Sequence, residues 1–355
     1  MNEPLARTVA RGIGRVLPRS WRRRVSAARA RALSARTRYQ LGRLAASGHP
    51  IIAGPYFGEV GFELLYWIPF LAWFSEEYGV APERVIAVSR GGAASWYAHL
   101  AARYCDVFEV TDPGEFRRRN GARALELGEQ KQYAVTAFDE EIVREVRARS
   151  GVDAEVLHPS MMYALFAPFW WGHMPIAWVD SHTRFRRLAA PPLPAALSLP
   201  QRFAAVKFYF NDCFADNAET RGFVQGVVRD VTRSLPVVSL STGLALDDHA
   251  ACEPHGSDEV VQPGYQARTN LDVQSAIVAR ARRFVGTYGG FAYLSPFFGV
   301  PATAYYSDPH GYSLRHLEVA RLAIDRLGGG ALLDVRDISA RGPAVREGGL
   351  TCSTR

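Results

Sequence analysis

The stretch "FVGTYGGFAYLSPFFGVPATAYY", residues 284–306, combines two glycines with the pattern of a strand, a turn, a short helix and a second strand. Gly289 and Gly290 fall at the carboxyl end of the first predicted strand, where glycine lets the backbone turn sharply and approach a neighbouring group. The helix that follows directs its unpaired N–H groups at this turn, and such groups bind anions. The stretch therefore predicts an anion-binding turn, with an ordinary tight turn as the alternative.

Several other chemistries lack their motifs in this chain. No GxxxxGK[ST] sequence indicates a P-loop, no GxGxxG sequence follows a strand, and no GxSxG sequence marks a serine nucleophile. The four cysteines have no CxxC spacing, the histidines lack i, i+4 pairs, and the acids of "LDDH" at 246–249 are typical of a solvated turn. We therefore expect no bound metal, and we expect a reducing compartment.

The composition is that of a globular protein, with 355 residues, 48% hydrophobic and 22% charged. This length suits two domains, and no apolar run reaches the ~20 residues that a membrane-spanning helix requires. The net charge of +7 is unevenly distributed, because residues 1–45 hold twelve arginines and a single acid, Glu3. The rest of the chain is accordingly mildly acidic.

From residue 51 onward, short apolar segments alternate with segments whose apolar residues recur at helical spacing. This alternation is typical of a largely parallel sheet with helices on both faces. In the first half, the predicted strands are 51–56, 84–89, 107–112 and 132–138, and the predicted helices are 59–79, 93–104 and 139–151. In the second half, strands are predicted at 202–210, 236–242, 258–263 and twice within 284–306, and helices at 217–234, 270–282, within 284–306 and from about Tyr312.

A proline-rich stretch, 188–201, separates these two halves as a linker would. We therefore predict two doubly wound, Rossmann-like α/β domains, 46–190 and 200–340, that face each other across a cleft and follow a basic arm, 1–45. Open α/β sheets bind ligands beyond the carboxyl ends of their strands. There this chain collects its glycine and polar residues, at 58–63, 89–92, 211–216, 241–243 and 287–291.

The basic arm has the pattern of an amphipathic helix. Arg7, Arg11, Arg15 and Arg19 recur every four residues, beside a modest apolar stripe before Pro18. Such a segment favours an anionic membrane surface. The alternatives are a solvated tail and nucleic-acid binding, although the arm has few aromatic residues and no recognition motif follows it. We expect a cytoplasmic protein, peripheral at the inner face of the membrane, with no nucleic-acid partner.

Residues 157–182 interrupt the alternation with aromatic residues, prolines and three histidines. Large aromatic side chains are usually buried, so this segment can form a helical cap over the sheet. The alternative is an acceptor pocket or lid.

The order of elements in "TNLDVQSAIVARARRFVGTYGGFAYLSPFFGVPATAYY", 269–306, resembles the nucleotide-sugar half of GT-B glycosyltransferases. Heptosyltransferase-like and fucosyltransferase-like branches are the most similar in pattern. The stretch "GPYFGEVGFELLYWIPFL", 54–71, is similar to their first strand–helix loop. The resemblance covers most of residues 50–325 at the level of motifs. Two features depart from it: glutamate stands where heptosyltransferases carry an aspartate after glycine, and Pro296 interrupts the short helix.

The resemblance implies a GT-B fold with a nucleotide-sugar donor in the second domain and an acceptor in the first. The donor diphosphate would lie at the predicted anion-binding turn. Lys207 would add a cation or have a structural role, and Asn270 would contact phosphate or ribose, or cap its helix. The implied donor-binding residues are Lys207, Ser241, Thr242, Gly243, Arg268, Asn270, Thr287, Tyr288, Gly289, Gly290 and Phe291. The implied acceptor-side residues are Gly58, Gly61 and His158.

Glycosyl transfer also needs a base for the acceptor hydroxyl group. We predict Glu59, in the glycine-rich turn, as this base and Glu63, four residues later, as a residue that positions the acceptor. The alternative for each is a charge that stabilises the start of a helix. The implied activity is metal-independent and cofactor-free transfer to a glycan or lipid-linked acceptor, as in cell-envelope polysaccharide synthesis. An epimerase-like nucleotide-sugar enzyme and a non-catalytic binding protein that uses the basic arm are the alternatives.

Overall fold

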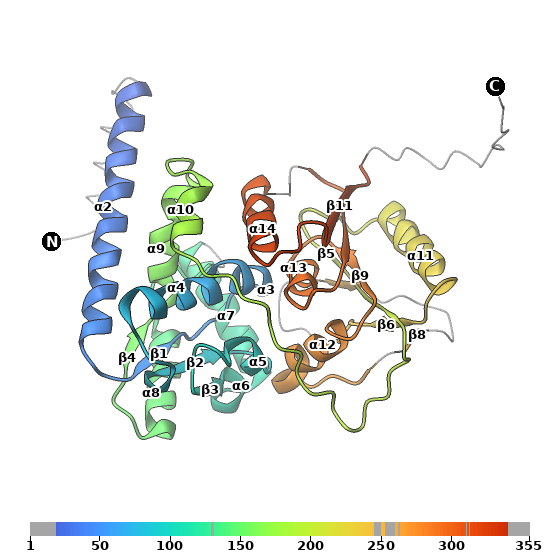
Figure 1. The fold of residues 1–355 in the computed structure, drawn as a ribbon, viewed down its shortest axis with the longest axis horizontal. Helices are drawn as coiled ribbons and strands as arrows, with labels where there is room; N and C mark the ends of the chain where they lie inside the picture. Colours follow the sequence, from blue (N-terminus) through green and yellow to red (C-terminus); the bar gives the residue numbers. More distant parts are fainter. Residues whose placement is uncertain are drawn as a thin grey trace.

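The computed structural model describes residues 19–128, 131–244, 250–252, 260–261, 263–309, 311 and 313–339. It contains two α/β halves side by side, each built around a parallel sheet (Figure 1). This confirms the predicted fold class of two facing α/β sheets with helices packed around them. The largest hydrophobic cluster runs through both halves without a break, so the halves are packed firmly against each other.

The first sheet has four parallel strands in the order β3-β2-β1-β4. Its inner strands β1 and β2 are fully buried, which explains why their residues are apolar apart from the terminal Ser89. The strands are β1 Ile51–Ala53, β2 Val85–Ser89, β3 Arg103–Asp106 and β4 Glu155–Leu157. The helices of this half are α2 Arg19–Ala46, α3 Val60–Phe62, a π-helix Glu63–Trp67, α4 Ile68–Tyr78, α5 Ala94–Tyr97, α6 Val107–Val110, α7 Pro113–Leu127, α8 Ala137–Ser150, α9 Pro159–Trp170 and α10 Ile176–Ser181, with a 3₁₀ turn at Pro82–Arg84.

The second sheet has the order β11-β10-β9-β5-β6-β8, with short β7 antiparallel to the end of β5. Its central strand β5 is buried along nearly its whole length. The strands are β5 Ala204–Phe210, β6 Val237–Ser239, β7 Ala250–Cys252, β8 Val260–Val261, β9 Arg283–Thr287, β10 Ala302–Tyr306 and β11 Leu333–Asp337. The helices are α11 Ala218–Thr232, α12 Asn270–Val278, α13 Gly290–Phe297 and α14 Leu314–Arg326, and a 3₁₀ turn spans Ala267–Thr269. Between α10 and β5, residues 183–203 contain no helix or strand.

Two predicted strands of the first half are wrong. Residues 107–112 begin helix α6, because the Asp106 carboxylate accepts the backbone N–H of Phe108 (2.9 Å) and starts a helix there. The strand lies earlier, at β3, whose first two residues fall at the end of the helix predicted at 93–104. The segment 132–138 is not a strand either, since a capping box between Thr136 and Asp139 starts α8. Strands β4, β7 and β11 and helix α7 were not predicted.

The basic segment 1–45 is not a separate arm throughout. In α2, a stripe at helical spacing is buried, namely Ala30, Ser34, Thr37, Leu41 and Leu44, and the helix packs along α9 (Figure 1). This packing makes the second half of the segment part of the first α/β half. The arginines at positions 7, 11 and 15 lie outside the described residues. No helix in the described ranges is long and apolar enough to cross a membrane.

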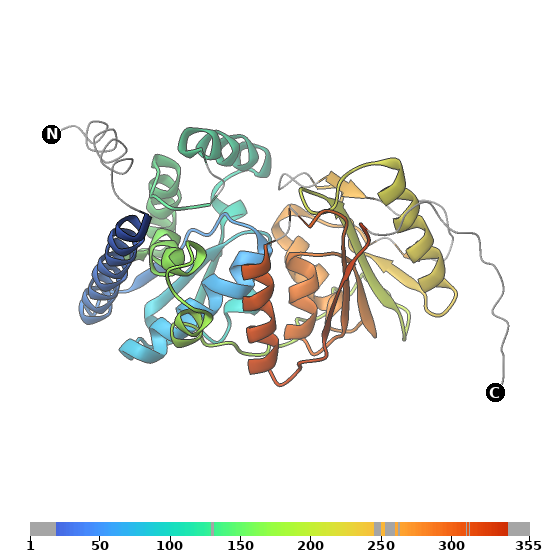
Figure 2. The same cartoon turned by 90° about the horizontal axis from the view of Figure 1, so that it is seen from above.

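Helices α13 and α14 lie at the junction of the halves in both views (Figures 1 and 2). Both helices contact the segment formed by α3 and the π-helix of the first half. The carboxyl ends of β1 and β9 lead directly into α3 and α13, so the strand ends of both sheets meet at this junction.

Candidate functional site

The two halves touch at a pair of glycines, one from each helix start. A Cβ atom on Gly290 would lie 2.8 Å from the backbone nitrogen of Gly61 and 2.9 Å from the Cβ of Val60. Neither distance is compatible with a side chain, so only glycine lets α13 approach α3 this closely. Gly290 is therefore required by the packing of the halves, which the sequence did not indicate.

Contacts within the protein also explain why residue 289 is glycine. Its φ of +150° is a conformation that glycine alone adopts readily, and a Cβ atom there would lie 2.0 Å from the hydroxyl oxygen of Tyr209. We predicted that both positions are glycine because the backbone approaches a ligand there. Contacts within the protein explain both glycines without a ligand. Both nevertheless line a cavity at the junction.

A second junction contact involves the turn after β2. The backbone N–H of Leu271 donates to the carbonyl of Gly91 (2.7 Å), and a Cβ on Gly92 would lie 2.7 Å from the carbonyl oxygen of Arg268. The indole N–H of Trp96 donates to Ser275 (2.9 Å) in a buried position. The first turn of α12 is therefore in contact with the turn after β2.

Between these contacts lies a cavity that we call the sheet-end cavity, with a volume of about 220 Å³. The second half contributes Lys207, Tyr209, Ser241, Asn270, Tyr288 and Phe291, among others. The first half contributes Glu59, Gly61, Tyr66 and Arg90. Six of the predicted donor-side residues, besides Gly289 and Gly290, therefore line one cavity: the five of them just named and Thr242.

Lys207 places its ammonium group at the wall of this cavity. The Nζ atom donates to the side-chain oxygen of Gln274 (2.6 Å) and to the carbonyl of Leu240 (3.1 Å). It also lies 4.1 Å from the centre of the Phe291 ring, a favourable cation–π arrangement. The ammonium group of Lys207 thus lies between two oxygen acceptors and an aromatic ring at the cavity wall.

Asn270 lines the sheet-end cavity with an amide that is already used. It donates to the carbonyl of Ala267 (2.8 Å) and accepts from the side chain of Gln274 (3.0 Å). Asn270 is the first residue of α12, the residue before it is Thr269, and no side chain caps this helix start, so the predicted capping alternative is wrong. In contrast, the hydroxyl group of Ser241 is buried at the cavity and has no hydrogen-bond partner among the described residues.

Three predicted donor-side residues do not line the cavity. The Thr287 hydroxyl accepts the N–H of Tyr209 (3.0 Å) and donates to its carbonyl (2.9 Å), so it ties β9 to β5. Arg268 is exposed. Gly243 has a φ of +62° in the loop after β6 and is likewise absent from the cavity wall.

Glu63 lies in the core of the first half and lines neither cavity described in this section. Its Oε1 atom accepts hydrogen bonds from the hydroxyl groups of Ser89 (2.5 Å) and Tyr97, and its Oε2 atom has no partner among the described residues. Burial raises the pKa of this carboxyl group to about 7, although Arg90 and the two hydroxyl groups act in the opposite direction. The predicted role of Glu63 in positioning an acceptor by contact is therefore incorrect.

Glu59 is exposed and precedes the first turn of α3. It lines the sheet-end cavity and also a second, adjacent cavity. Its loop is fixed by Arg90, whose Nη2 donates to the Gly58 carbonyl (2.5 Å) and whose Nε reaches the Phe57 carbonyl (3.5 Å). The carboxylate of Glu59 thus stands on a braced loop between two cavities.

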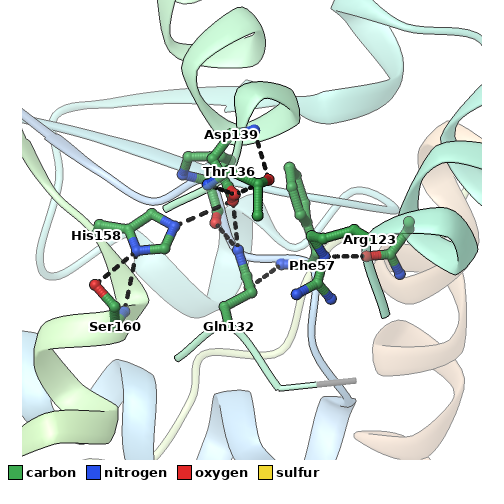
Figure 3. A network of polar contacts seen from close by, with 9 residues as sticks. Phe57, Arg123, Gln132, Thr136, Asp139, His158 and Ser160 are labelled. Carbon is green, nitrogen blue, oxygen red and sulfur yellow. Dashed lines mark hydrogen bonds and ion pairs between the residues drawn. The ribbon is translucent and has the colours of Figure 1, made fainter. Parts of the chain in front are cut away.

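A buried polar network holds the same loop from below (Figure 3). Gln132 donates to the Pro55 carbonyl (2.9 Å) and to Asp139 (3.0 Å), and it accepts the N–H of Phe57 (2.8 Å). His158 donates from Nε2 to Asp139 (3.1 Å) and accepts the Ser160 N–H (3.1 Å) at the start of α9. Predicted as an acceptor-side residue, His158 is instead a buried helix cap that supports the network.

Asp139 is the charged centre of this network. Burial would raise its pKa, but hydrogen bonds from His158 and Thr136 outweigh burial and hold the pKa below its ordinary value. The carboxylate therefore stays ionised at neutral pH. A charged acceptor shared by several donors gives the loop that carries Glu59 a rigid base.

The second cavity, which we call the α7 cavity, has a volume of about 460 Å³ and adjoins the first. Its wall includes Gly58 and Glu59 of the braced loop, Arg117 and Arg123 of α7, and Lys131. None of these basic residues was predicted as a site residue, and helix α7, which carries two of them, was not predicted. An Asp followed by Pro is also a helix-start signal, and the Asp112 side chain does cap α7.

His316 was also missed. It comes from α14 and lines both cavities. Its Nδ1 atom lies 2.8 Å from the hydroxyl oxygen of Tyr66, and its ring meets the Phe62 ring edge-on at 4.5 Å. Burial and then the neighbouring charge of Lys131 lower its pKa to about 4, so the imidazole is neutral at neutral pH. Nothing in "SLRHLEVARL" distinguishes this histidine from an ordinary helical residue.

No protein-family model and no curated protein sequence matches the chain. Solved structures do. The glycosyl transferase family 9 protein from Veillonella parvula is 13% identical over 83% of this chain and 88% of that chain, with a TM-score of 0.43. The ADP-heptose LPS heptosyltransferase II of E. coli is 11% identical over 82% and 90%, with a TM-score of 0.39.

The iron-containing dodecameric glycosyltransferase TibC from enterotoxigenic E. coli is 10% identical over 75% of this chain, with a TM-score of 0.40. The chain spans 61% of the length of that protein. These likenesses concern the fold alone.

Proposed function

We propose that the protein is a glycosyltransferase that moves a sugar from a nucleotide-sugar donor to a glycan or lipid acceptor. The observation that carries this proposal is the placement of Glu59, an exposed carboxylate on a braced loop, between two adjoining cavities at the strand ends of both halves. A transferase needs two substrates side by side and a base where they meet. In this proposal residues 46–190 form the acceptor domain and residues 200–340 the donor domain.

The sheet-end cavity has the chemistry for the donor. Lys207 and the first residues of α13 line the same cavity, and an ammonium group and a helix N-terminus both stabilise negative charge. The Ser241 hydroxyl offers a further polar contact. A diphosphate there would leave more easily, because its growing negative charge is met by positive groups already in place.

Transfer of the sugar would then proceed in one concerted step. The acceptor hydroxyl oxygen forms a bond to the anomeric carbon of the sugar, and Glu59 takes the hydroxyl proton. The bond from that carbon to the diphosphate breaks, and its electron pair leaves with the diphosphate. Lys207 and the start of α13 carry the charge stabilisation, so the proposal involves no metal in this step.

We also propose that α2 brings the protein to an anionic membrane surface on the cytoplasmic side. Arg29, Arg36 and Arg43 are exposed and recur every seven residues, so they share one stripe of the helix. Each contributes on the order of 1 kcal/mol near anionic lipid. Replacing all three by glutamine should abolish sedimentation with anionic vesicles, whereas Arg229→Gln with Arg233→Gln on α11 should not. Equal sedimentation of all variants would refute this proposal.

The experiment that tests the proposed activity is a thermal-shift panel of nucleoside diphosphates and nucleotide-sugars with the full chain. A ligand that binds the folded state raises its melting temperature. We expect at least one nucleoside diphosphate to do so, and Lys207→Met to reduce that shift. A panel without any shift would contradict a donor site in the sheet-end cavity. Conversion of a nucleotide-sugar to its epimer without an acceptor would favour an epimerase instead.

A further inference from the structure

The imidazole ring of His316 uses one nitrogen within the protein and leaves the other accessible. Its Nδ1 atom lies 2.8 Å from the hydroxyl oxygen of Tyr66. Its Nε2 atom has no hydrogen-bond partner among the described residues, and it is not one of their buried unpaired polar atoms. Because His316 lines both cavities, a ligand can reach this nitrogen where the two cavities adjoin.

The contact with Tyr66 decides which ring nitrogen carries the proton. Tyr66 is fully buried, and burial raises the pKa of its hydroxyl group far above the ordinary value. The hydroxyl proton therefore stays in place and needs an acceptor, which among the described residues is Nδ1 of His316. Burial and then the charge of Lys131 lower the pKa of this imidazole to about 4, so the ring is neutral at neutral pH. A neutral ring that accepts at Nδ1 carries its proton at Nε2.

Contacts across the junction of the halves also fix the orientation of this ring. The Phe62 ring meets it edge-on at 4.5 Å, and Tyr66 belongs to the π-helix Glu63–Trp67, so both contacts come from the first half. His316 itself belongs to the second half, where the Ser313 side chain accepts its backbone N–H (3.4 Å) at the start of α14. The Nε2–H group is therefore held in position before any ligand binds, as a preorganised hydrogen-bond donor.

Two groups of opposite hydrogen-bonding character thus line both cavities. Glu59 offers a carboxylate, which accepts, and His316 offers an N–H group, which donates. Because the imidazole is neutral, it does not form an ion pair with Glu59 that would weaken this carboxylate as a base. In the proposed transfer, Glu59 serves the acceptor hydroxyl group. The oxygen that leaves the sugar needs a donor instead, since negative charge grows on it.

We propose that His316 is a further catalytic residue, whose Nε2–H group donates a hydrogen bond to the diphosphate oxygen that leaves the anomeric carbon, and that Tyr66 positions it. This inference rests on the proposed function, because it assigns the diphosphate to the sheet-end cavity. His316 transfers no proton. The bond between carbon and oxygen breaks, its electron pair stays on the diphosphate oxygen, and the hydrogen bond strengthens as the charge grows. Glu59 receives the proton of the acceptor hydroxyl group.

The test observes the ring nitrogens by NMR in the full chain with isotope-labelled histidines at neutral pH. Loss of a signal in His316→Gln assigns the His316 nitrogens. Without ligand, we expect the proton on Nε2 and none on Nδ1. Pyrophosphate, ADP, UDP and GDP are the probes, and binding should shift the Nε2 signal of His316. His173 is the control, because it bonds to Ser26 (2.7 Å) and lines neither cavity, so its signals should not move.

Two variants at position 316 separate hydrogen-bond donation from packing. Glutamine keeps an N–H donor near the position of Nε2, whereas leucine fills the space without one. Affinity for the probe that binds should fall about tenfold in His316→Leu and less than about threefold in His316→Gln. Equal losses in the two variants would mean that the N–H group does not contact the diphosphate.

Tyr66→Phe tests the positioning role, since it removes the hydroxyl group and keeps the ring. We expect the His316 proton to be shared between Nδ1 and Nε2 in this variant, in a protein that still folds cooperatively. A proton that stays on Nε2 alone would show that Tyr66 does not set the tautomer.

The outcomes distinguish this inference from the proposed function. A proton on Nδ1 in the ligand-free protein, or a bound nucleoside diphosphate that leaves the Nε2 signal unchanged, would overturn the role of His316 and leave the proposed transferase intact. If nucleoside diphosphates fail to bind while pyrophosphate still shifts the Nε2 signal, the nucleotide-sugar donor fails and His316 stands as a diphosphate ligand. Failure of every probe to bind would overturn both.

Discussion

Each half of the protein presents a glycine-containing turn between a strand and a helix, and the two turns touch at Gly61 and Gly290. The turn of the first half, after β1, is braced from two sides and exposes a carboxylate, Glu59, between two cavities. The turn of the second half, after β9, has no acid. Its glycines fit against Tyr209 and the first half, and its charge comes from the neighbouring strand, at Lys207.

The comparison shows that two glycine-containing turns with similar sequences can have different structural roles. In the first turn the backbone is fixed by side chains far away in the sequence, such as Gln132 and Arg90, so that one side chain is presented accurately. In the second turn, Gly290 lets the two halves approach closely, and Gly289 leaves room for the hydroxyl group of Tyr209. A glycine-rich turn at a strand end is therefore evidence of close approach, but the approaching group can be protein as well as ligand.

The sharpest test of the second turn is Gly289→Ala. The new methyl group would meet the Tyr209 hydroxyl oxygen in a backbone conformation that disfavours alanine. We expect a loss of about 3 kcal/mol in the free energy of unfolding, measured by chemical denaturation. Gly222→Ala in α11, where a Cβ atom meets nothing within 4 Å, should instead be neutral or slightly stabilising.

A second variant tests the cause of that loss. Tyr209→Phe removes the hydroxyl oxygen and leaves the nearest ring carbon 3.3 Å from the new Cβ atom. The double variant should therefore recover part of the stability, as a coupling between the two sites. Strict additivity of the two single changes would mean that the contact with Tyr209 is not why position 289 is glycine.

For the first turn, Glu59→Gln should lower turnover by at least ~100-fold at saturating donor, with donor affinity little changed. The reason is that glutamine keeps the size of the side chain but cannot take a proton. Single-turnover kinetics and nucleotide titration supply the two measurements. His316→Gln is the informative companion, since His316 lines the same two cavities. Near-normal turnover of Glu59→Gln together with loss in His316→Gln would move the base to α14.

Glu63 should have a smaller effect, which is a pH dependence of the free energy of unfolding. Its pKa is raised from 4.5 to about 7 in the folded protein, so the unfolded chain loses this proton at lower pH than the folded chain does. The folded state is thus progressively disfavoured as pH rises from about 5 to about 7, by about 2 kcal/mol. Glu63→Gln removes this dependence, so the variant should gain stability relative to the wild type as pH rises.

Denaturation midpoints of both proteins at pH 5 and pH 8 measure this gain. A difference between Glu63→Gln and the wild type that stays constant with pH would show that the buried carboxyl group titrates near its ordinary range.

Much of the fold could be predicted because buried parallel strands have distinctive sequences. The segments "RVIAVS" and "RFAAVKFYF" became β2 and β5, since strands covered on both faces must be apolar. The edge strand β3, "RYCD", could not be recognised, because a strand exposed on one side has no such requirement and its exposed Arg103 and half-buried Tyr104 resemble the end of a helix. Helix α7 carried a recognisable start, Asp112-Pro113, which competes with the same pair as a turn signal.

The sequence by itself determined the α/β class, the order of most strands and helices, the placement of Glu59 and the glycines after strand ends, and that of Lys207 within a strand. These follow from local rules, namely apolar periodicity and the conformational freedom of glycine. Only the tertiary structure decided which polar residues face a cavity. Glu63 and His158 are buried supports, Thr287 joins two strands, and Arg117, Arg123 and Lys131 line a cavity that no local pattern marks. The physical reason is that a side chain is exposed or buried by what packs on it, and its neighbours here lie up to 250 positions away, as between Tyr66 and His316.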